Sequence, residues 1–98
     1  MALEIRWSKK ADNRFDQILE YLQVEWGEKV TSAFVKKVFD FLEILSEFPE
    51  IGTVENQTKS IRGFAIIKQI KIFYKINKNY VTILNFYDTR QNPKNKPF

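Results

Sequence analysis

The chain has 98 residues, which is enough for one folded domain but too few for two domains that each bury a core. Apolar residues make up 44% and charged residues 29% of the chain, as in folded proteins. Cysteine and histidine are both absent, which excludes disulfides, thiolate nucleophiles, imidazole metal sites and Ser-His-Asp triads. The net charge of +4 is divided unevenly, because residues 1–55 hold 7 Lys/Arg and 11 Asp/Glu whereas residues 56–98 hold 9 Lys/Arg and a single acid.

The first half of the sequence predicts a short strand followed by two helices. Residues 3–7 alternate apolar and polar side chains, as in a half-buried strand, and Ser8 then offers an N-cap hydroxyl. Apolar side chains recur at helical spacing from about residue 9 to residue 26, and again from about 28 to 47. Gly27 separates the two helices. A link this short predicts an antiparallel helical hairpin.

The second helix is apolar beyond a single stripe. Val35, Phe39, Ile44 and Phe48 lie on flanks outside the main apolar face. Either this helix is buried on two sides, which is the commoner arrangement, or part of it is a docking surface.

The second half of the sequence predicts a three-stranded antiparallel meander. Residues 53–60 are polar and are expected to form a loop, and strands follow over 61–68, 70–76 and 80–87. Asn77, Lys78 and Asn79 supply a turn, and residues 88–98 form a polar, basic tail. The first strand must join this sheet to satisfy its backbone groups. The expected fold is therefore a single α+β domain over residues 1–98, of order β-α-α-β-β-β, with the helical hairpin on one face of the sheet.

The other face of the sheet is expected to carry the functional side chains. On strand 70–76 the apolar positions mark the core, so the intervening lysines point outward. The sequence does not fix the register between strands, and placing the neighbouring strand's Arg62 and Phe64 beside Lys71 is an inference. The expected open face combines cations with aromatic rings: Arg62, Lys71, Lys75, Tyr87, Arg90, Phe64 and Phe73. Phosphates bind cations and unstacked bases stack on rings, so this face is suited to a polyanion, although each residue alone also has an ordinary structural role.

The chain resembles the RelE/ParE family of toxins from type II toxin–antitoxin modules, and its ParE-like branch in particular. The order and spacing of many short matches along residues 3–93 carry the resemblance: Trp7-Ser8 with Ala11, Ile18, Tyr21-Leu22, Trp26-Gly27, Phe34, Pro49-x-x-Gly52, Ile61-Arg62, Lys71-x-x-Tyr74-Lys75-Ile76, Val81-x-Ile83-Leu84 and Asp88-x-Arg90. The element order read from periodicity agrees with the fold of that family.

The resemblance implies a growth-inhibiting toxin of the kind found in plasmid stabilisation modules, neutralised by a cognate antitoxin protein encoded alongside it. RelE-like members are mRNA endoribonucleases that act mostly on the ribosome without a metal, whereas ParE-like members inhibit DNA gyrase and are not enzymes. The fold does not choose between these mechanisms. Under either one we expect a cytoplasmic protein without a cofactor or a membrane partner.

For mRNA cleavage, the resemblance assigns catalytic roles to Arg62, Lys71, Tyr87 and Arg90. The three cations would stabilise the charge of the phosphorane, with Lys71 standing where many members have arginine. Tyr87 stands where other members place histidine or tyrosine, and without histidine only Tyr87 or a carboxylate such as Asp88 remains as the general base.

Gyrase inhibition requires only a binding surface, and the two long helices with their tight link look more like the ParE branch. Two other interpretations remain open: a non-catalytic nucleic-acid-binding module with a basic sheet face, and a degenerate toxin that acts only as an interaction partner.

Overall fold

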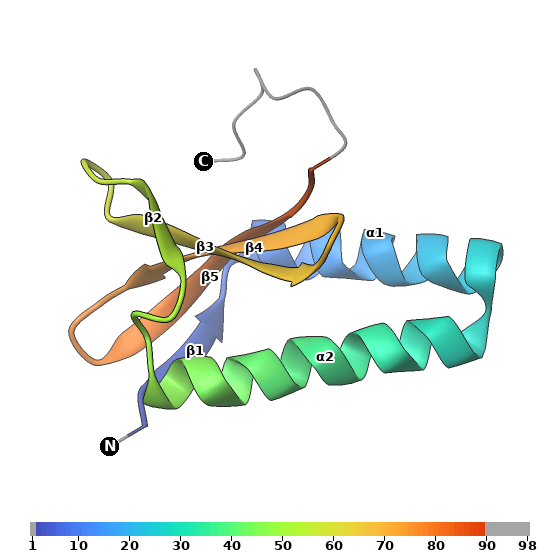
Figure 1. Ribbon diagram of the computed structural model, residues 1–98, viewed down its shortest axis with the longest axis horizontal. Helices are drawn as coiled ribbons and strands as arrows, with labels where there is room; N and C mark the ends of the chain where they lie inside the picture. The colour runs from blue at the N-terminus through green and yellow to red at the C-terminus, as the bar shows by residue number, and fades with distance from the viewer. Residues whose placement is uncertain (1, 90–98) are drawn as a thin grey trace.

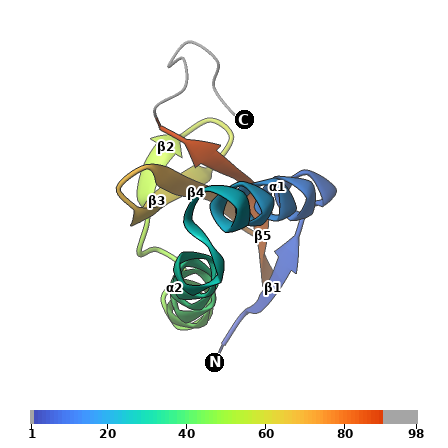
Figure 2. The ribbon, with the colours of Figure 1, turned by 90° about the vertical axis from the view of Figure 1, so that its right-hand side faces the viewer.

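The fold is a two-helix layer packed on a five-stranded sheet. A computed structural model of the protein describes residues 2–89. In chain order it contains β1 (Glu4–Trp7), α1 (Lys9–Trp26), α2 (Glu28–Glu47), β2 (Thr53–Asn56), β3 (Ile61–Ile67), β4 (Ile70–Ile76) and β5 (Tyr80–Asp88). The sheet has the order β1-β5-β4-β3-β2, with β1 parallel to β5 and the other neighbours antiparallel. Both helices lie on the same side of the sheet (Figure 1, Figure 2), so the predicted α+β architecture is confirmed.

The segment predicted as a loop contains an additional strand. Residues 53–56 form β2, which pairs with β3 through Thr53 opposite Gly63 and Val54 opposite Arg62. The sequence of β2, Thr-Val-Glu-Asn, has a single apolar side chain, so no alternation of apolar and polar residues indicated a strand there. The prediction of a loop over 53–60 is therefore wrong for its first half.

Hydrogen bonds from Ser8 join the start of α1 to β5. The Ser8 Oγ accepts a hydrogen bond of 3.0 Å from the Ala11 N–H, which confirms the predicted N-cap. The same hydroxyl donates to the Leu84 carbonyl at 3.0 Å, and the Ser8 N–H donates to the Ile83 carbonyl at 2.9 Å. These bonds fix the beginning of α1 against the sheet. At its other end the chain turns at Gly27, whose φ of 87° is a conformation that favours glycine.

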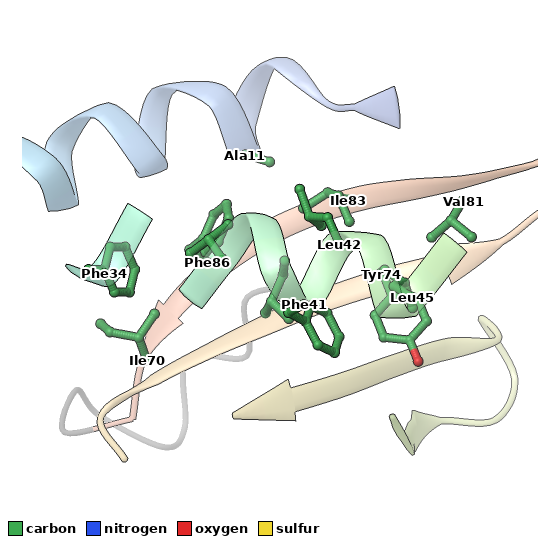
Figure 3. Close-up of a cluster of buried hydrophobic side chains, with 12 residues drawn as sticks. Ala11, Phe34, Phe41, Leu42, Leu45, Ile70, Tyr74, Val81, Ile83 and Phe86 are labelled. Carbon is green, nitrogen blue, oxygen red and sulfur yellow. The ribbon is translucent and has the colours of Figure 1, made fainter. Parts of the chain in front are cut away.

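The core lies between α2 and the central strands. Figure 3 shows Phe41, Leu42 and Leu45 of α2 facing Tyr74 of β4 and the side chains of β5. The Phe41 ring also stacks on Phe64 of β3, with 4.4 Å between the ring centroids. Burial of one such large apolar side chain stabilises the fold by about 1.5–3 kcal/mol. Ala11 and Phe15 of α1 join the same cluster, with the Phe15 ring packed beside Phe86 of β5, so both helices are held to the sheet by one core.

The second helix is not buried on two sides. Phe39 is 52% exposed, Ile44 46% and Phe48 67%, while Val35 is partly buried. Of the two alternatives for these flanks, exposure holds for three of the four residues, although the Phe39 ring also packs beside Trp7 and Phe15. We call Ile44 and Phe48, near the C-terminal end of α2 and at its cap, the α2 apolar surface. Within residues 2–89, neither helix is apolar enough along its length to cross a membrane.

Candidate functional site

Lys71 and Tyr87 meet on the open face of the sheet. They are directly paired across β4 and β5, so their side chains leave the sheet on the same side. The Phe73 ring lies beside both, with its centroid 6.2 Å from the Tyr87 ring centroid and 5.8 Å from the Lys71 Nζ. The cation and the phenol that the sequence placed together are therefore neighbours.

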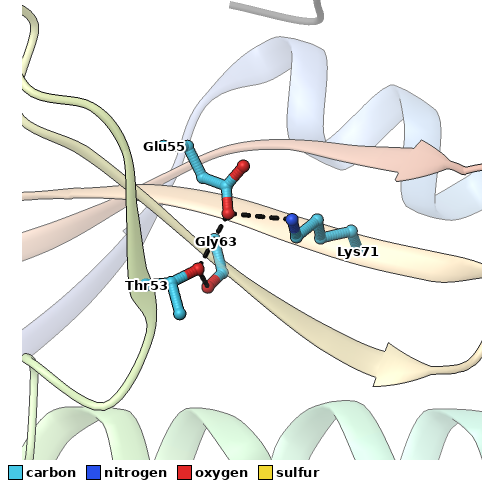
Figure 4. Close-up of polar contacts among 4 residues, drawn as sticks. All are labelled: Thr53, Glu55, Gly63 and Lys71. Atoms are coloured by element: carbon cyan, nitrogen blue, oxygen red, sulfur yellow. Dashed lines mark hydrogen bonds and ion pairs between the residues drawn. The ribbon is translucent and has the colours of Figure 1, made fainter. Parts of the chain in front are cut away.

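Glu55 of β2 forms an ion pair with the Lys71 ammonium group. The Lys71 Nζ lies 2.8 Å from the Glu55 Oε2, and both side chains are mostly buried, at 28% and 21% exposure (Figure 4). The Thr53 Oγ1 donates a second bond of 2.8 Å to the same carboxylate oxygen. Gly63 leaves the room for this arrangement, since a Cβ there would lie 2.9 Å from the Glu55 Cγ. The charge of Lys71 is thus balanced inside the protein.

Arg62 lies on the helix face of the sheet instead of the open face. It pairs with Tyr74 across β3 and β4, and paired residues of antiparallel strands project to the same side. Phe64 likewise pairs with the fully buried Ile72. The large Phe64 ring packs in the core. Because Arg62 lies two residues before Phe64 on β3, its side chain projects to the same face, toward the helices. The predicted placement of both residues beside Lys71 is therefore wrong, because a one-residue difference in register exchanges the two faces.

The Arg62 guanidinium binds the chain between α2 and β2. Its Nη1 donates to the Gly52 carbonyl at 2.8 Å and to the Glu50 carbonyl at 3.2 Å. The buried Tyr74 hydroxyl donates to the Pro49 carbonyl and accepts from the Gly52 N–H, both at 2.8 Å. Burial raises the pKa of the Tyr74 phenol, while the Gly52 N–H and the Arg62 charge act in the opposite direction. Together these two side chains hold the turn that positions β2 and hence Glu55.

The remaining predicted cations do not complete a cluster in the described structure. Lys75 lies farther along β4, opposite Ile61 and Thr82, and is exposed. Arg90 lies outside the described residues. Among residues 2–89 no group of three carboxylates gathers where it could hold a metal ion.

Glu55 is the site residue that the sequence analysis missed. It lies in the segment expected to be a loop, and only its pairing with β3 brings its carboxylate over β4. The two β-branched residues Thr53 and Val54 before it were the available signal for a strand. Within residues 2–89, the open face presents the Tyr87 phenol beside a lysine whose charge is balanced by Glu55.

A family model described as the ParE toxin of the type II toxin–antitoxin system parDE matches residues 5–93. No curated protein matches the chain. Among solved structures, one titled as a chromosomal ParDE system from P. aeruginosa superposes with a TM-score of 0.74 at 15% identity, covering 89% of this chain and 96% of that one. A YoeB dimer from Staphylococcus aureus superposes with a TM-score of 0.63 at 15% identity, covering 89% of this chain and 97% of that one. A YoeB/ParE toxin from Agrobacterium tumefaciens has a TM-score of 0.63 at 11% identity, covering 88% of this chain and 98% of that one. The structures support the fold, and the match over most of its length shows that the chain belongs to the ParE toxin family of type II toxin–antitoxin systems.

Proposed function

We propose that the protein arrests growth by binding DNA gyrase and not by cleaving mRNA. The observation that carries this proposal is the separation of the candidate catalytic residues. Arg62 is held by backbone carbonyls on the helix face, and Lys71 is ion-paired with Glu55 on the other. Phosphoryl transfer to a 2′-hydroxyl needs cations and a base converging on one phosphate, whereas inhibition by binding needs neither.

The experiment compares the two target reactions directly. The chain is expressed without its antitoxin, and mRNA ends are mapped while purified protein is titrated into a gyrase supercoiling assay. Inhibited supercoiling with intact mRNA is the expected result. New mRNA ends together with normal supercoiling would contradict the proposal.

Ribosome-dependent mRNA cleavage is the second candidate, and the pairing of Lys71 with Tyr87 favours it. In that mechanism Tyr87 would act on the ribose hydroxyl and Lys71, released from Glu55, would stabilise the phosphate. Tyr87→Phe would then abolish growth arrest. Under the gyrase proposal, Tyr87→Phe retains growth arrest because it keeps the ring and removes only the hydroxyl.

The partner that neutralises the toxin is proposed to be an antitoxin that docks on the α2 apolar surface. Related solved structures include a YoeB–YefM complex, and here Ile44 and Phe48 expose apolar area that a partner helix would cover. Ile44→Glu is expected to leave growth arrest intact but prevent rescue by the neighbouring open reading frame. Val24→Glu, at the 77% exposed Val24 of α1, is the matched control and should be rescued normally.

A further inference from the structure

The α2 apolar surface continues into the turn that follows the helix. A hollow of about 530 Å³ lies where the chain passes from α2 to β2 (Figure 1), and Phe48 and Ile51 line it between acidic residues. Phe48 is 67% exposed and Ile51 41%, and Ile44, one helical turn before Phe48, is 46% exposed. The apolar area and the carboxylates around it form one region of the surface. We call it the acidic-apolar patch: Glu43, Ile44, Glu47, Phe48, Glu50 and Ile51.

Negative charge is concentrated in this part of the chain. Residues 38–58 hold five acids and no lysine or arginine. Two of these acids are neutralised in the structure, because Asp40 pairs with Lys36 at 2.9 Å and Glu55 pairs with Lys71 at 2.8 Å. The other three belong to the acidic-apolar patch, are exposed, and form no ion pair within residues 2–89: Glu43, Glu47 and Glu50.

The three unpaired carboxylates do not stabilise α2. The C-terminal end of a helix carries partial negative charge, which favours cations there and disfavours carboxylates. The last turn of α2 holds no cation, and Glu47 is its final residue. Arg62 reaches this turn but donates to the Glu50 backbone carbonyl. No three carboxylates among residues 2–89 gather closely enough to hold a metal ion. The patch is therefore suited to the positive charge of a partner protein.

We propose that the antitoxin segment covering the α2 apolar surface is basic and amphipathic. Its apolar side chains lie on Ile44, Phe48 and Ile51, and its lysines or arginines lie beside the three carboxylates that flank them. This inference rests on the proposed docking of the antitoxin at this surface, and adds the chemistry of the segment that docks. Because the chain carries a net charge of +4, a basic segment is attracted to this patch and not to the molecule as a whole. Charges at the rim of an interface select partners in this way.

The charge is tested by calorimetric titration of the protein with the antitoxin encoded by the neighbouring open reading frame. Replacing Glu43, Glu47 and Glu50 together by Gln should weaken binding about tenfold at about 50 mM salt. At about 500 mM salt the same variant should differ from the wild type by less than about twofold, because salt screens exposed charges. Since the substitutions remove carboxylates from the unfavourable end of a helix, the variant should unfold at an equal or higher temperature, and weaker binding then does not reflect unfolding.

A matched charge control comes from α1. Asp16, Glu20 and Glu25 are all exposed, and Asp16→Asn with Glu20→Gln and Glu25→Gln removes the same charge from the other helix. This control should change the affinity by less than about twofold at either salt concentration. Equal weakening by the two triple variants would overturn the proposal, because the antitoxin would then respond to overall charge. Tighter binding by the variant at residues 43, 47 and 50 would overturn it as well, since it would mean an acidic segment.

The apolar contact is tested separately with Ile44→Ser and Phe48→Ser in one chain, which changes no charge. This variant should weaken binding by a similar factor at both salt concentrations. If it binds the antitoxin as the wild type does, the proposed docking surface itself is refuted. If it binds weakly while the triple Gln variant binds normally, the docking surface stands and the basic character of the segment is refuted.

A second copy of this chain is the other protein that could cover the patch. Sedimentation of the protein without antitoxin should show a monomer. A dimer that is abolished by Ile44→Ser with Phe48→Ser would overturn the proposal, because the apolar residues would then be covered by self-association.

Discussion

Replacing Arg62 by Gln distinguishes a structural arginine from a catalytic one. In the structure its guanidinium donates to the Gly52 and Glu50 carbonyls at 2.8 and 3.2 Å, and the side chain is partly exposed. A hydrogen bond from a charged group contributes about 1.5–3 kcal/mol, and partial exposure allows water to replace part of it. We therefore expect Arg62→Gln to lower the free energy of unfolding by about 1–2 kcal/mol. In a domain of this size that corresponds to a decrease of roughly 4–16 °C in Tm.

The assay is urea unfolding followed by tryptophan fluorescence, with growth arrest measured on the same variants. Lys75→Gln is the matched control, because Lys75 is an exposed cation on the neighbouring strand and its loss should change stability by less than about 0.5 kcal/mol. We expect Arg62→Gln to lose stability and to retain growth arrest wherever it is folded. An Arg62→Gln protein that is as stable as the control but no longer arrests growth would refute this reasoning and place Arg62 in the functional site.

Three further predictions concern the turn and the ion pair that position β2. Tyr74→Phe should cost about 1–3 kcal/mol in urea unfolding, because the buried Gly52 N–H loses its acceptor, whereas Tyr21→Phe on the exposed side of α1 should be neutral. Burial raises the pKa of Tyr74 above its ordinary value of 10.0, so the folded state holds the phenol proton more tightly than the unfolded chain does. The free energy of unfolding should therefore be fully present below about pH 10 and fall above it. Tyr74→Phe should reduce this fall. Gly63→Ala should destabilise the fold by about 1–3 kcal/mol, because its Cβ would lie 2.9 Å from the Glu55 Cγ; a variant as stable as wild type would show that Glu55 moves aside freely.

Local chemistry made the helices and their boundaries predictable. Ser8 and Gly27 flank α1 at the positions expected from capping, and the apolar period gave both helices over their observed lengths. The meander of β3, β4 and β5 was equally visible, because each strand is long enough for alternation to show.

The open face was predicted only in part, because it depends on register and on an edge strand. Lys71 and Tyr87 lie where the period of two places them, while Arg62 and Phe64 follow the pairing of β3 with Tyr74 and Ile72. Nothing in a single strand's alternation indicates which of its two faces meets the helices when one face holds Ile61, Gly63 and Ala65 and the other holds Arg62 and Phe64. The volume of the Phe64 ring decides the matter, since it fills the space beside Phe41 that the small side chains would leave empty.

The charge division of the sequence is likewise reorganised by the fold. In the basic half, residues 56–98, Arg62 donates to backbone carbonyls and Lys71 forms an ion pair with Glu55. The excess of positive charge at the surface of this half is therefore smaller than the residue counts imply. The acidic half, in contrast, contains Lys9, Lys10 and Arg14, which lie in the first two turns of α1 together with Asp12 and Asp16. A net charge summed along a segment therefore does not locate a charged surface, because folding pairs some of its charges inside the protein.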